Sequence, residues 1–152
     1  MSTMIVAERP DSMDARTLIT ELEAYLAPLY PAESQHGLSV GQLLREKVAF
    51  FVVRQDGVAA GCGGVQLFGT EYGEVKRMYI RPQYRGLGLA KRLLDHLESY
   101  AREHHVKILR LETGIDQGEA IGLYERMGFH RIPPFGAYQE DPLSRFYEKR
   151  IG

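Results

Sequence analysis

A chain of 152 residues, 44% hydrophobic and 26% charged, has the size and composition of one globular domain, so we expect a single domain over residues 1–152. Its formal net charge of −1 gives no general attraction to nucleic acid or to an anionic membrane, and neither is expected as a partner. No apolar run approaches the roughly 18 residues of a membrane-spanning helix, and no pattern of a secretory signal is found at the start. The one cysteine, Cys62, excludes an internal disulfide, and together these features predict a cytoplasmic protein.

Hydrophobic periodicity predicts seven strands and four helices. In chain order, the expected elements are a strand at 4–9, a helix capped by Asp11 or Ser12, a short helix opened by a capping box at 39–42, strands at 48–53, 58–67 and 74–80, a helix at 88–103, a strand at 108–113, a helix opened by a second capping box at 116–119, and strands at 129–135 and 144–149. This order, β-α-α-β-β-β-α-β-α-β-β, predicts an α+β fold. Antiparallel hairpins come first, and one right-handed crossover then joins the fourth strand to the fifth.

A basic, glycine-rich turn connects the strand at 74–80 to the helix at 88–103. Gly86 and Gly88 have no Cβ, so the backbone there can curve tightly and approach a ligand. The first N–H groups of the following helix are unpaired and carry the positive end of its dipole, and Arg85 adds a planar donor fork beside them. The turn therefore suits a phosphate or a pyrophosphate, although an ordinary glycine-containing turn would show the same residues.

Two well-known phosphate motifs do not fit this turn. The dinucleotide fingerprint G-x-G-x-x-G would need glycine where Lys91 stands, and the P-loop pattern has no match in the chain. The pattern that does fit is R-x-x-G-x-A, from Arg85 through Gly88 to Ala90. It resembles the pyrophosphate loop of the GNAT superfamily of N-acetyltransferases, which bind acetyl-coenzyme A.

A second segment, from Gly118 to Phe129, also resembles a GNAT segment. An alanine, Ala120, stands four residues before Tyr124, and Gly-Phe follows the tyrosine within five residues. The family often carries asparagine seven residues before this tyrosine, where this chain has Gln117. Because both motifs occur in the family's order and the expected elements follow its plan, nearly the whole chain is identified as a member of the superfamily.

The resemblance implies a mostly antiparallel sheet in which the parallel fourth and fifth strands splay apart. Acetyl-CoA, as cosubstrate and without a metal, would lie between these strands. Its pantetheine amides would pair with the fourth strand like an added strand, and its pyrophosphate would meet the turn. The residues that the resemblance implies for coenzyme binding are Met78, Tyr79, Ile80, Arg85, Gly86, Leu87, Gly88, Leu89, Ala90, Gln117 and Tyr124.

Acetyl transfer to an amine needs a base, a donor for the oxyanion, and a proton for the leaving thiolate. Glu74 is the first candidate base, because some GNAT enzymes place a catalytic glutamate there; Glu112 is the runner-up, and either could act through water. Strand alternation would place Glu74, Lys76, Met78 and Ile80 on one face. Glu74 could equally be a strand-end glutamate in water.

The same resemblance implies that Tyr124 protonates the thiolate, because a phenol with a pKa of about 10 keeps its proton near pH 7. Without the family, a core aromatic on an amphipathic helix would be the simpler interpretation of Tyr124. A backbone N–H of Met78 or Tyr79 would hold the oxyanion.

The resemblance implies an acceptor pocket that includes Tyr30, His36, Lys76, Glu112 and Tyr138, although the aromatic residues could simply pack against the sheet. Lys76 and its neighbour Arg77 could bind a carboxylate of the acceptor or be plain surface charges. The sequence thus predicts direct acetyl transfer, in a ternary complex, to a primary amine of a small molecule, a peptide or a protein lysine. A non-catalytic coenzyme A sensor is the alternative, and a homodimer is compatible with the family.

Overall fold

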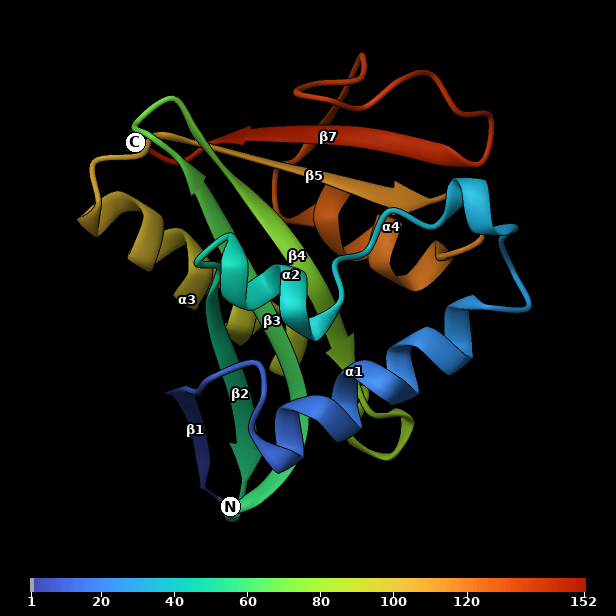
Figure 1. Cartoon of the computed structure of the whole chain (residues 1–152). Coiled ribbons are helices and arrows are strands. Elements are labelled where there is room, and N and C mark those ends of the chain that lie inside the picture. Colours follow the sequence, from blue (N-terminus) through green and yellow to red (C-terminus); the bar gives the residue numbers. More distant parts are fainter. Residues whose placement is uncertain (1) are drawn as a thin grey trace.

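Seven strands form one sheet with helices on both faces in the computed structural model, which describes residues 2–152 (Figure 1). The elements are β1 (Thr3–Ala7), α1 (Met13–Leu26), η1 (Ala32–Ser34), α2 (Val40–Arg45), β2 (Ala49–Gln55), β3 (Val58–Phe68), β4 (Tyr72–Ile80), η2 (Pro82–Tyr84), α3 (Leu89–Glu103), β5 (Ile108–Gly114), α4 (Gly118–Arg126), β6 (His130–Ile132) and β7 (Ser144–Arg150). The predicted α+β class and order of strands and α-helices are confirmed. No helix in the described part of the chain is long and apolar enough to span a membrane.

Local hydrogen bonds explain where several of these elements begin. The hydroxyl of Ser12 accepts the N–H of Ala15 at 3.1 Å and caps α1. Ser39 and Gln42 form the predicted capping box at the start of α2. Asp56 and Gly57 both have positive φ, which makes the two-residue turn of the β2–β3 hairpin.

Two local predictions were wrong. The capping box expected at 116–119 does not form, because α4 starts after Gln117, whose side chain turns back to accept the N–H of Gly114 at 2.8 Å. The strand expected at 129–135 is limited to β6, His130–Ile132. Pro133 and Pro134 follow β6, and a proline has no N–H with which to continue a ladder.

The sheet order β1-β2-β3-β4-β5-β7-β6 is antiparallel except between β4 and β5. The parallel register of these two strands pairs Gly73 with Leu109 and Glu74 with Arg110, and includes no pair beyond them. Past Glu74 the strands diverge, as Figure 1 shows for the arrows of β4 and β5. The predicted splay is therefore confirmed, and it opens the sheet at its centre.

A β-bulge interrupts β4 inside this open part. The register with β3 shifts between Cys62 and Gly64, so that Arg77 and Met78 together lie opposite Gly63. Arg77 has a φ of 54°, which few non-glycine residues adopt. A bulge bends its strand and changes the direction of the side chains that follow it.

The bulge overturns the prediction that Glu74, Lys76, Met78 and Ile80 share one face. Glu74 and Lys76 line the cavity on the α1–α2 side, but Met78 and Ile80 pack with the core beneath α3. Tyr79 instead belongs to the core beneath α1 and donates its hydroxyl to Glu21 of that helix at 3.1 Å. Strict alternation fails because one extra residue is inserted at the bulge.

The helices cover separate cores on the two faces. One side of α3 is buried against one face of the sheet, at Leu89, Leu93, Leu94, Leu97 and Ala101, with Tyr100 partly buried beside them. The apolar side of α1 and residue Leu43 of α2 cover the other face. Both faces are therefore closed by helices, and the splay between β4 and β5 gives access to the middle of the sheet.

Candidate active site

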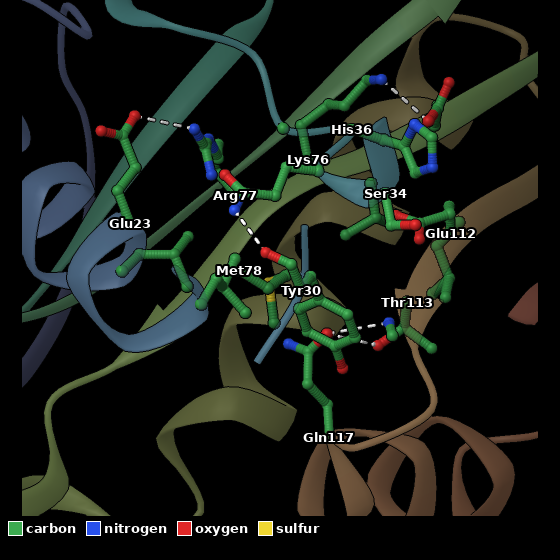
Figure 2. Close-up of a pocket in the computed structure, with 18 of the residues that line it drawn as sticks. Glu23, Tyr30, Ser34, His36, Lys76, Arg77, Met78, Glu112, Thr113 and Gln117 are labelled. Carbon is green, nitrogen blue, oxygen red and sulfur yellow. Dashed lines mark hydrogen bonds and ion pairs between the residues drawn. The ribbon is translucent and has the colours of Figure 1, made fainter. Parts of the chain in front are cut away.

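The splay of β4 and β5 opens two cavities that meet inside the sheet. The turn cavity, of about 890 Å³, lies against residues 84–91 and α4. The α1–α2 cavity, of about 540 Å³, lies beneath the segment that joins α1 to α2 (Figure 2). Met78, Gln117 and Tyr124 line both. Two molecules, one in each cavity, can therefore meet at these three residues.

The turn that walls the first cavity owes its shape to two glycines. Gly86 and Gly88 have φ values of 81° and 76°, and a Cβ added to either would meet no atom within 4 Å. Glycine is therefore needed there for backbone conformation rather than for space. Arg85 Nε donates to the carbonyl of Ile80 at 3.1 Å, which fixes the turn against the end of β4.

The same turn places the N-terminus of α3 at the turn cavity. Gly88 is the N-cap and has no side chain to pair with the first N–H groups of α3, and both Leu89 and Ala90 line the cavity. Unpaired amides at the positive end of a 15-residue helix suit a diphosphate, so the residues present fit coenzyme A. Every predicted coenzyme-binding residue except Leu87, which is half exposed, lines the turn cavity.

Tyr124 stands where the two cavities join. Its side chain is buried, its ring packs on Phe129, and its hydroxyl makes no hydrogen bond to the rest of the described chain. Burial raises the pKa of Tyr124 above its ordinary value, because the phenolate would lose its hydration. The hydroxyl thus keeps its proton and can donate a hydrogen bond to a bound molecule.

Glu74 lies in a buried cluster with Lys76 and Tyr138. Its Oε2 atom accepts from Lys76 Nζ at 2.8 Å and from the Tyr138 hydroxyl at 2.5 Å. Lys76 also reaches the Tyr138 oxygen at 3.3 Å. Burial and the carboxylate of Glu74 raise the pKa of Tyr138 above its ordinary value. The alternative of a strand-end glutamate in water was wrong, because Glu74 is 3% exposed.

Glu112 lies on β5 and faces the same α1–α2 cavity. Its Oε2 atom accepts the hydroxyl of Ser144 at 2.7 Å, and no lysine, arginine or histidine of the described chain forms an ion pair with it. Burial raises the pKa of Glu112 above the ordinary glutamate value, and the Ser144 hydrogen bond opposes that shift. Glu112 therefore keeps more affinity for a proton than a glutamate in water.

Tyr30 forms a wall of the cavity at the end of β5. Its hydroxyl accepts the N–H of Asp116 at 3.0 Å and lies directly over Gly114. Burial raises its pKa above the ordinary tyrosine value. Tyr30 thus holds the α1–α2 segment against β5, and in Figure 2 its ring stands beside Thr113 and Gln117.

His36 and Arg77 both have carboxylate partners. His36 Nε2 lies 3.3 Å from Asp141 Oδ2, which joins the α1–α2 segment to the loop before β7. Arg77 Nη2 donates to Glu23 at 2.9 Å and its Nε to the carbonyl of Leu38 at 2.9 Å. The interpretation of Arg77 as a plain surface charge was wrong, because its side chain is 7% exposed and passes over Gly37.

Gln117 occupies the position where the family often has asparagine. Its Oε1 atom accepts from the N–H of Gly114 at 2.8 Å and from the hydroxyl of Thr113 at 3.3 Å. Figure 2 shows its amide nitrogen on the side away from Thr113. The side chain therefore fixes the turn after β5 and presents a donor at the junction of the cavities.

Several residues of the site carry no local signal in the sequence. Tyr25 of α1 lines the turn cavity, with its ring 6.0 Å from the guanidinium of Arg85. Ser144 and Asp141 complete the surroundings of Glu112 and His36. Each lies more than 30 residues from its partner, so only the fold brings them together.

The comparisons with known proteins agree with this geometry. Residues 14–129 match the acetyltransferase (GNAT) family. An Azospirillum brasilense protein named IAA acetyltransferase is 43% identical over 154 residues, with 99% of this chain and 100% of that protein covered. The crystal structure of a Klebsiella pneumoniae protein assigned as an acyl-CoA N-acyltransferase superimposes with a TM-score of 0.85 at 38% identity, covering 99% of this chain and 98% of that one.

A more distant structure has the same fold. The PaiA N-acetyltransferase from Thermoplasma acidophilum, solved in complex with coenzyme A, superimposes with a TM-score of 0.78 at 19% identity, with 99% of each chain covered. The matched segment, residues 14–129, includes both splayed strands, the turn before α3, Gln117 and Tyr124. The chain therefore belongs to the GNAT family and is an acetyl-CoA-dependent acetyltransferase.

Proposed function

We propose that the protein moves the acetyl group of acetyl-CoA directly to a primary amine, with both substrates bound at once. The observation that carries this proposal is the junction of the two cavities at Met78, Gln117 and Tyr124. A thioester in the turn cavity and an amine in the α1–α2 cavity would come together there. A covalent acetyl-enzyme has less support, because Cys62 is buried in the core beneath α1 and lines neither cavity.

In this proposal the turn and β4 hold the coenzyme. Backbone N–H groups from Gly86 to Ala90 and the guanidinium of Arg85 bind the diphosphate. The backbone from Met78 to Ile80 pairs with the pantetheine arm, because β5 has diverged and leaves that edge of β4 without a partner. Gln117 offers its amide N–H to the same arm.

The amine must lose a proton before its lone pair can attack the thioester carbon. Glu74 is one candidate base, but its Oε2 atom already accepts from both Lys76 and Tyr138. Glu112 has a pKa raised by burial and lacks an ion-pair partner within the described chain, which favours it as the proton acceptor, directly or through water. We therefore assign proton removal to Glu112 and the shaping of the cavity to the Glu74 cluster.

As the C–N bond forms, negative charge develops on the thioester oxygen. The bulge at Arg77 and Met78 takes backbone amides out of the β3 ladder, and the N–H of Met78 or Tyr79 would stabilise that oxygen. When the C–S bond breaks, Tyr124 gives its proton to the sulfur, and the second proton that the nitrogen loses as the amide forms returns to the tyrosine oxygen. Its hydroxyl suits this role because it is protonated and has no competing partner in the described chain.

The acceptor is a primary amine in this proposal. The Azospirillum relative is named for IAA, so IAA belongs among the compounds to be tested. The α1–α2 cavity, with Tyr30, His36 and Tyr138 in its walls, is where we place the acceptor. Its volume of about 540 Å³ is in the range of small-molecule sites.

The test is release of coenzyme A thiol from acetyl-CoA with a panel of amines and IAA, for the wild type and for Tyr124→Phe. We expect kcat to fall about 100-fold in Tyr124→Phe, as for loss of a general acid, with unchanged affinity for coenzyme A by calorimetry. Tyr100→Phe, on α3 outside both cavities, is the matched control and should behave as wild type. Coenzyme A binding without turnover of any compound would instead indicate a regulator without catalysis.

A further inference from the structure

The charges that line the α1–α2 cavity are almost completely matched. Lys76 is one of its cations, and its ammonium lies 2.8 Å from Glu74 and 3.3 Å from the hydroxyl of Tyr138. The side chains of Lys76 and Glu74 are 10% and 4% exposed. Taking this ammonium away from its carboxylate would leave a buried charge without a partner, which is strongly unfavourable.

The other two basic side chains of the lining are matched as well. Arg77 is buried between Glu23 and the carbonyl of Leu38, each at 2.9 Å. His36 lies 3.3 Å from Asp141. Lys76, Arg77 and His36 are the basic side chains that line this cavity in the described chain. None of them is therefore free to pair with a carboxylate on a bound molecule.

Glu112 is the exception among the acidic residues. Glu23 and Glu74 form ion pairs, but the hydrogen-bond partner of Glu112 is the hydroxyl of Ser144 at 2.7 Å, and the charges of His36 and Lys76 act on it only from beyond ion-pair distance. Burial disfavours its charged form, and the raised pKa reflects that cost. Because His36 is paired with Asp141 outside the lining, Glu112 is the one carboxylate of the described lining that has no ion-pair partner.

We propose that the acetyl acceptor is a small amine that carries no carboxylate next to its ammonium group, rather than an amino acid. This inference rests on the proposed function. An ammonium beside Glu112 supplies the missing countercharge, and transfer of its proton to Glu112 leaves both groups neutral, ready for attack on the thioester. A carboxylate in the same substrate would enter a cavity without a free cation and would face the charge of Glu112. The rings of Tyr30 and Tyr138 supply contact surface for the rest of the molecule.

The test uses compounds that differ only beside the amine. The two series are tyramine, tyrosinamide and tyrosine, and isobutylamine, valinamide and valine. Within each series the amide has nearly the size of the acid but lacks its charge. We expect kcat/KM for the carboxylate compound to be about 100-fold below that of the free amine, with the amide much closer to the amine, since a site that leaves polar or charged groups unpaired discriminates strongly.

A binding measurement separates recognition from chemistry. Calorimetry of tyramine and tyrosine with the complex of enzyme and coenzyme A needs no turnover. We expect Glu112→Gln to weaken tyramine binding about tenfold and to leave tyrosine binding no weaker than in wild type, because the variant removes the attracting and the repelling charge together. Glu103→Gln, an exposed change on α3, is the matched control.

The outcomes are distinct. Two results would overturn the inference. If the carboxylate compounds have the same kcat/KM as the free amines, a charge beside the amine does not matter. If the amides have a kcat/KM as low as the carboxylate compounds, the size of the group decides and its charge does not. In either case the proposed function would stand, because an amine is still acetylated. If coenzyme A binds and no amine reacts, the proposed function fails and this inference fails with it.

Discussion

The hydroxyl of Tyr30 occupies the space that a side chain at position 114 would need. A Cβ built on Gly114 would lie 1.9 Å from this oxygen, and the same oxygen accepts the N–H of Asp116 at 3.0 Å. The contact joins the α1–α2 segment to the end of β5. The shape of the α1–α2 cavity therefore depends on one glycine and one tyrosine that are 84 residues apart.

This contact predicts that Gly114→Ala is destabilising. The methyl group would force Tyr30 away from β5, and overpacking of this kind costs about 1–3 kcal/mol. Urea unfolding followed by fluorescence measures the loss, and Tyr30→Ala in the same chain should recover part of it. Gly41→Ala is the control, because its Cβ would meet the flexible end of Arg45 at 3.3 Å and the Ser39 hydroxyl at an ordinary contact distance of 4.0 Å within a helix. Equal stability of Gly114→Ala and wild type would contradict the packing described here.

The Glu74–Lys76 pair predicts an effect on stability larger than that of a surface ion pair. Glu74→Gln leaves the buried ammonium of Lys76 without a countercharge, so we expect a loss of about 3 kcal/mol in the free energy of unfolding. The double variant Glu74→Gln, Lys76→Met should regain a large part of this loss, since it removes both charges. A double-mutant cycle in urea measures the coupling, and a coupling near zero would show that the pair is solvated in solution.

The raised pKa of Glu112 predicts two pH dependences. A carboxyl whose pKa is higher in the folded than in the unfolded chain binds more protons when folded, so stability falls as pH rises from the ordinary glutamate pKa through the raised value. Glu112→Gln has no carboxylate to bury, so its free energy of unfolding relative to that of the wild type should increase as the pH rises from the ordinary glutamate pKa through the raised value. Urea unfolding at several pH values between 4 and 8 measures the difference.

The second dependence is that of the rate. If Glu112 removes the proton from the amine, kcat/KM for wild type rises with pH through the same raised pKa, and Glu112→Gln loses about 100-fold in rate together with this acid limb. An acid limb that persists in Glu112→Gln would assign proton removal to another group, with Glu74 as the remaining candidate.

The position of Gly86 in the turn before α3 predicts that its replacement weakens coenzyme A binding as well as lowering stability. Gly86→Ala places a side chain at a φ of 81°, which costs about 1 kcal/mol, and adds a methyl group to a residue that lines the turn cavity. Gly57 has a φ of 82° and equally open surroundings, but lies in the β2–β3 hairpin. Both alanine variants should lose similar stability, whereas only Gly86→Ala should weaken coenzyme A binding, by about tenfold, in calorimetry. Equal affinities in the two variants would place the diphosphate elsewhere.

Direct transfer predicts that the single thiol is inert. Cys62 is fully buried beneath α1, and burial raises its pKa to about 12, so almost no thiolate is present near neutral pH. Iodoacetamide should modify Cys62 only after the chain is unfolded in urea, as followed by mass spectrometry. Rapid alkylation of the folded protein, with loss of activity, would reopen a covalent route.

The sequence alone determined the order of the elements and the position of the glycine-containing turn before α3. Both rest on local rules: apolar periodicity marks α3, capping residues mark the starts of α1 and α2, and Gly86 and Gly88 mark a turn with positive φ. Local rules failed where long-range contacts compete with them. The bulge at Arg77 reversed the alternation expected along β4, and the side chain of Gln117 turned back to β5 instead of following a capping box.

Only the tertiary structure decided which charges are matched inside the α1–α2 cavity. The sequence placed Lys76 on the same strand face as Glu74, but it did not indicate Tyr138, which lies 64 residues after Glu74. It gave Glu112 no partner, because Ser144 lies 32 residues further along the chain. Ion pairing and burial depend on which atoms meet in space. Here they depend on the positions of the segment that joins α1 to α2 and of the loop before β7, which contact each other through His36 and Asp141. The pattern of residues therefore predicts an acetyltransferase, while the pairing of its buried charges is the basis of the amine selectivity that we propose.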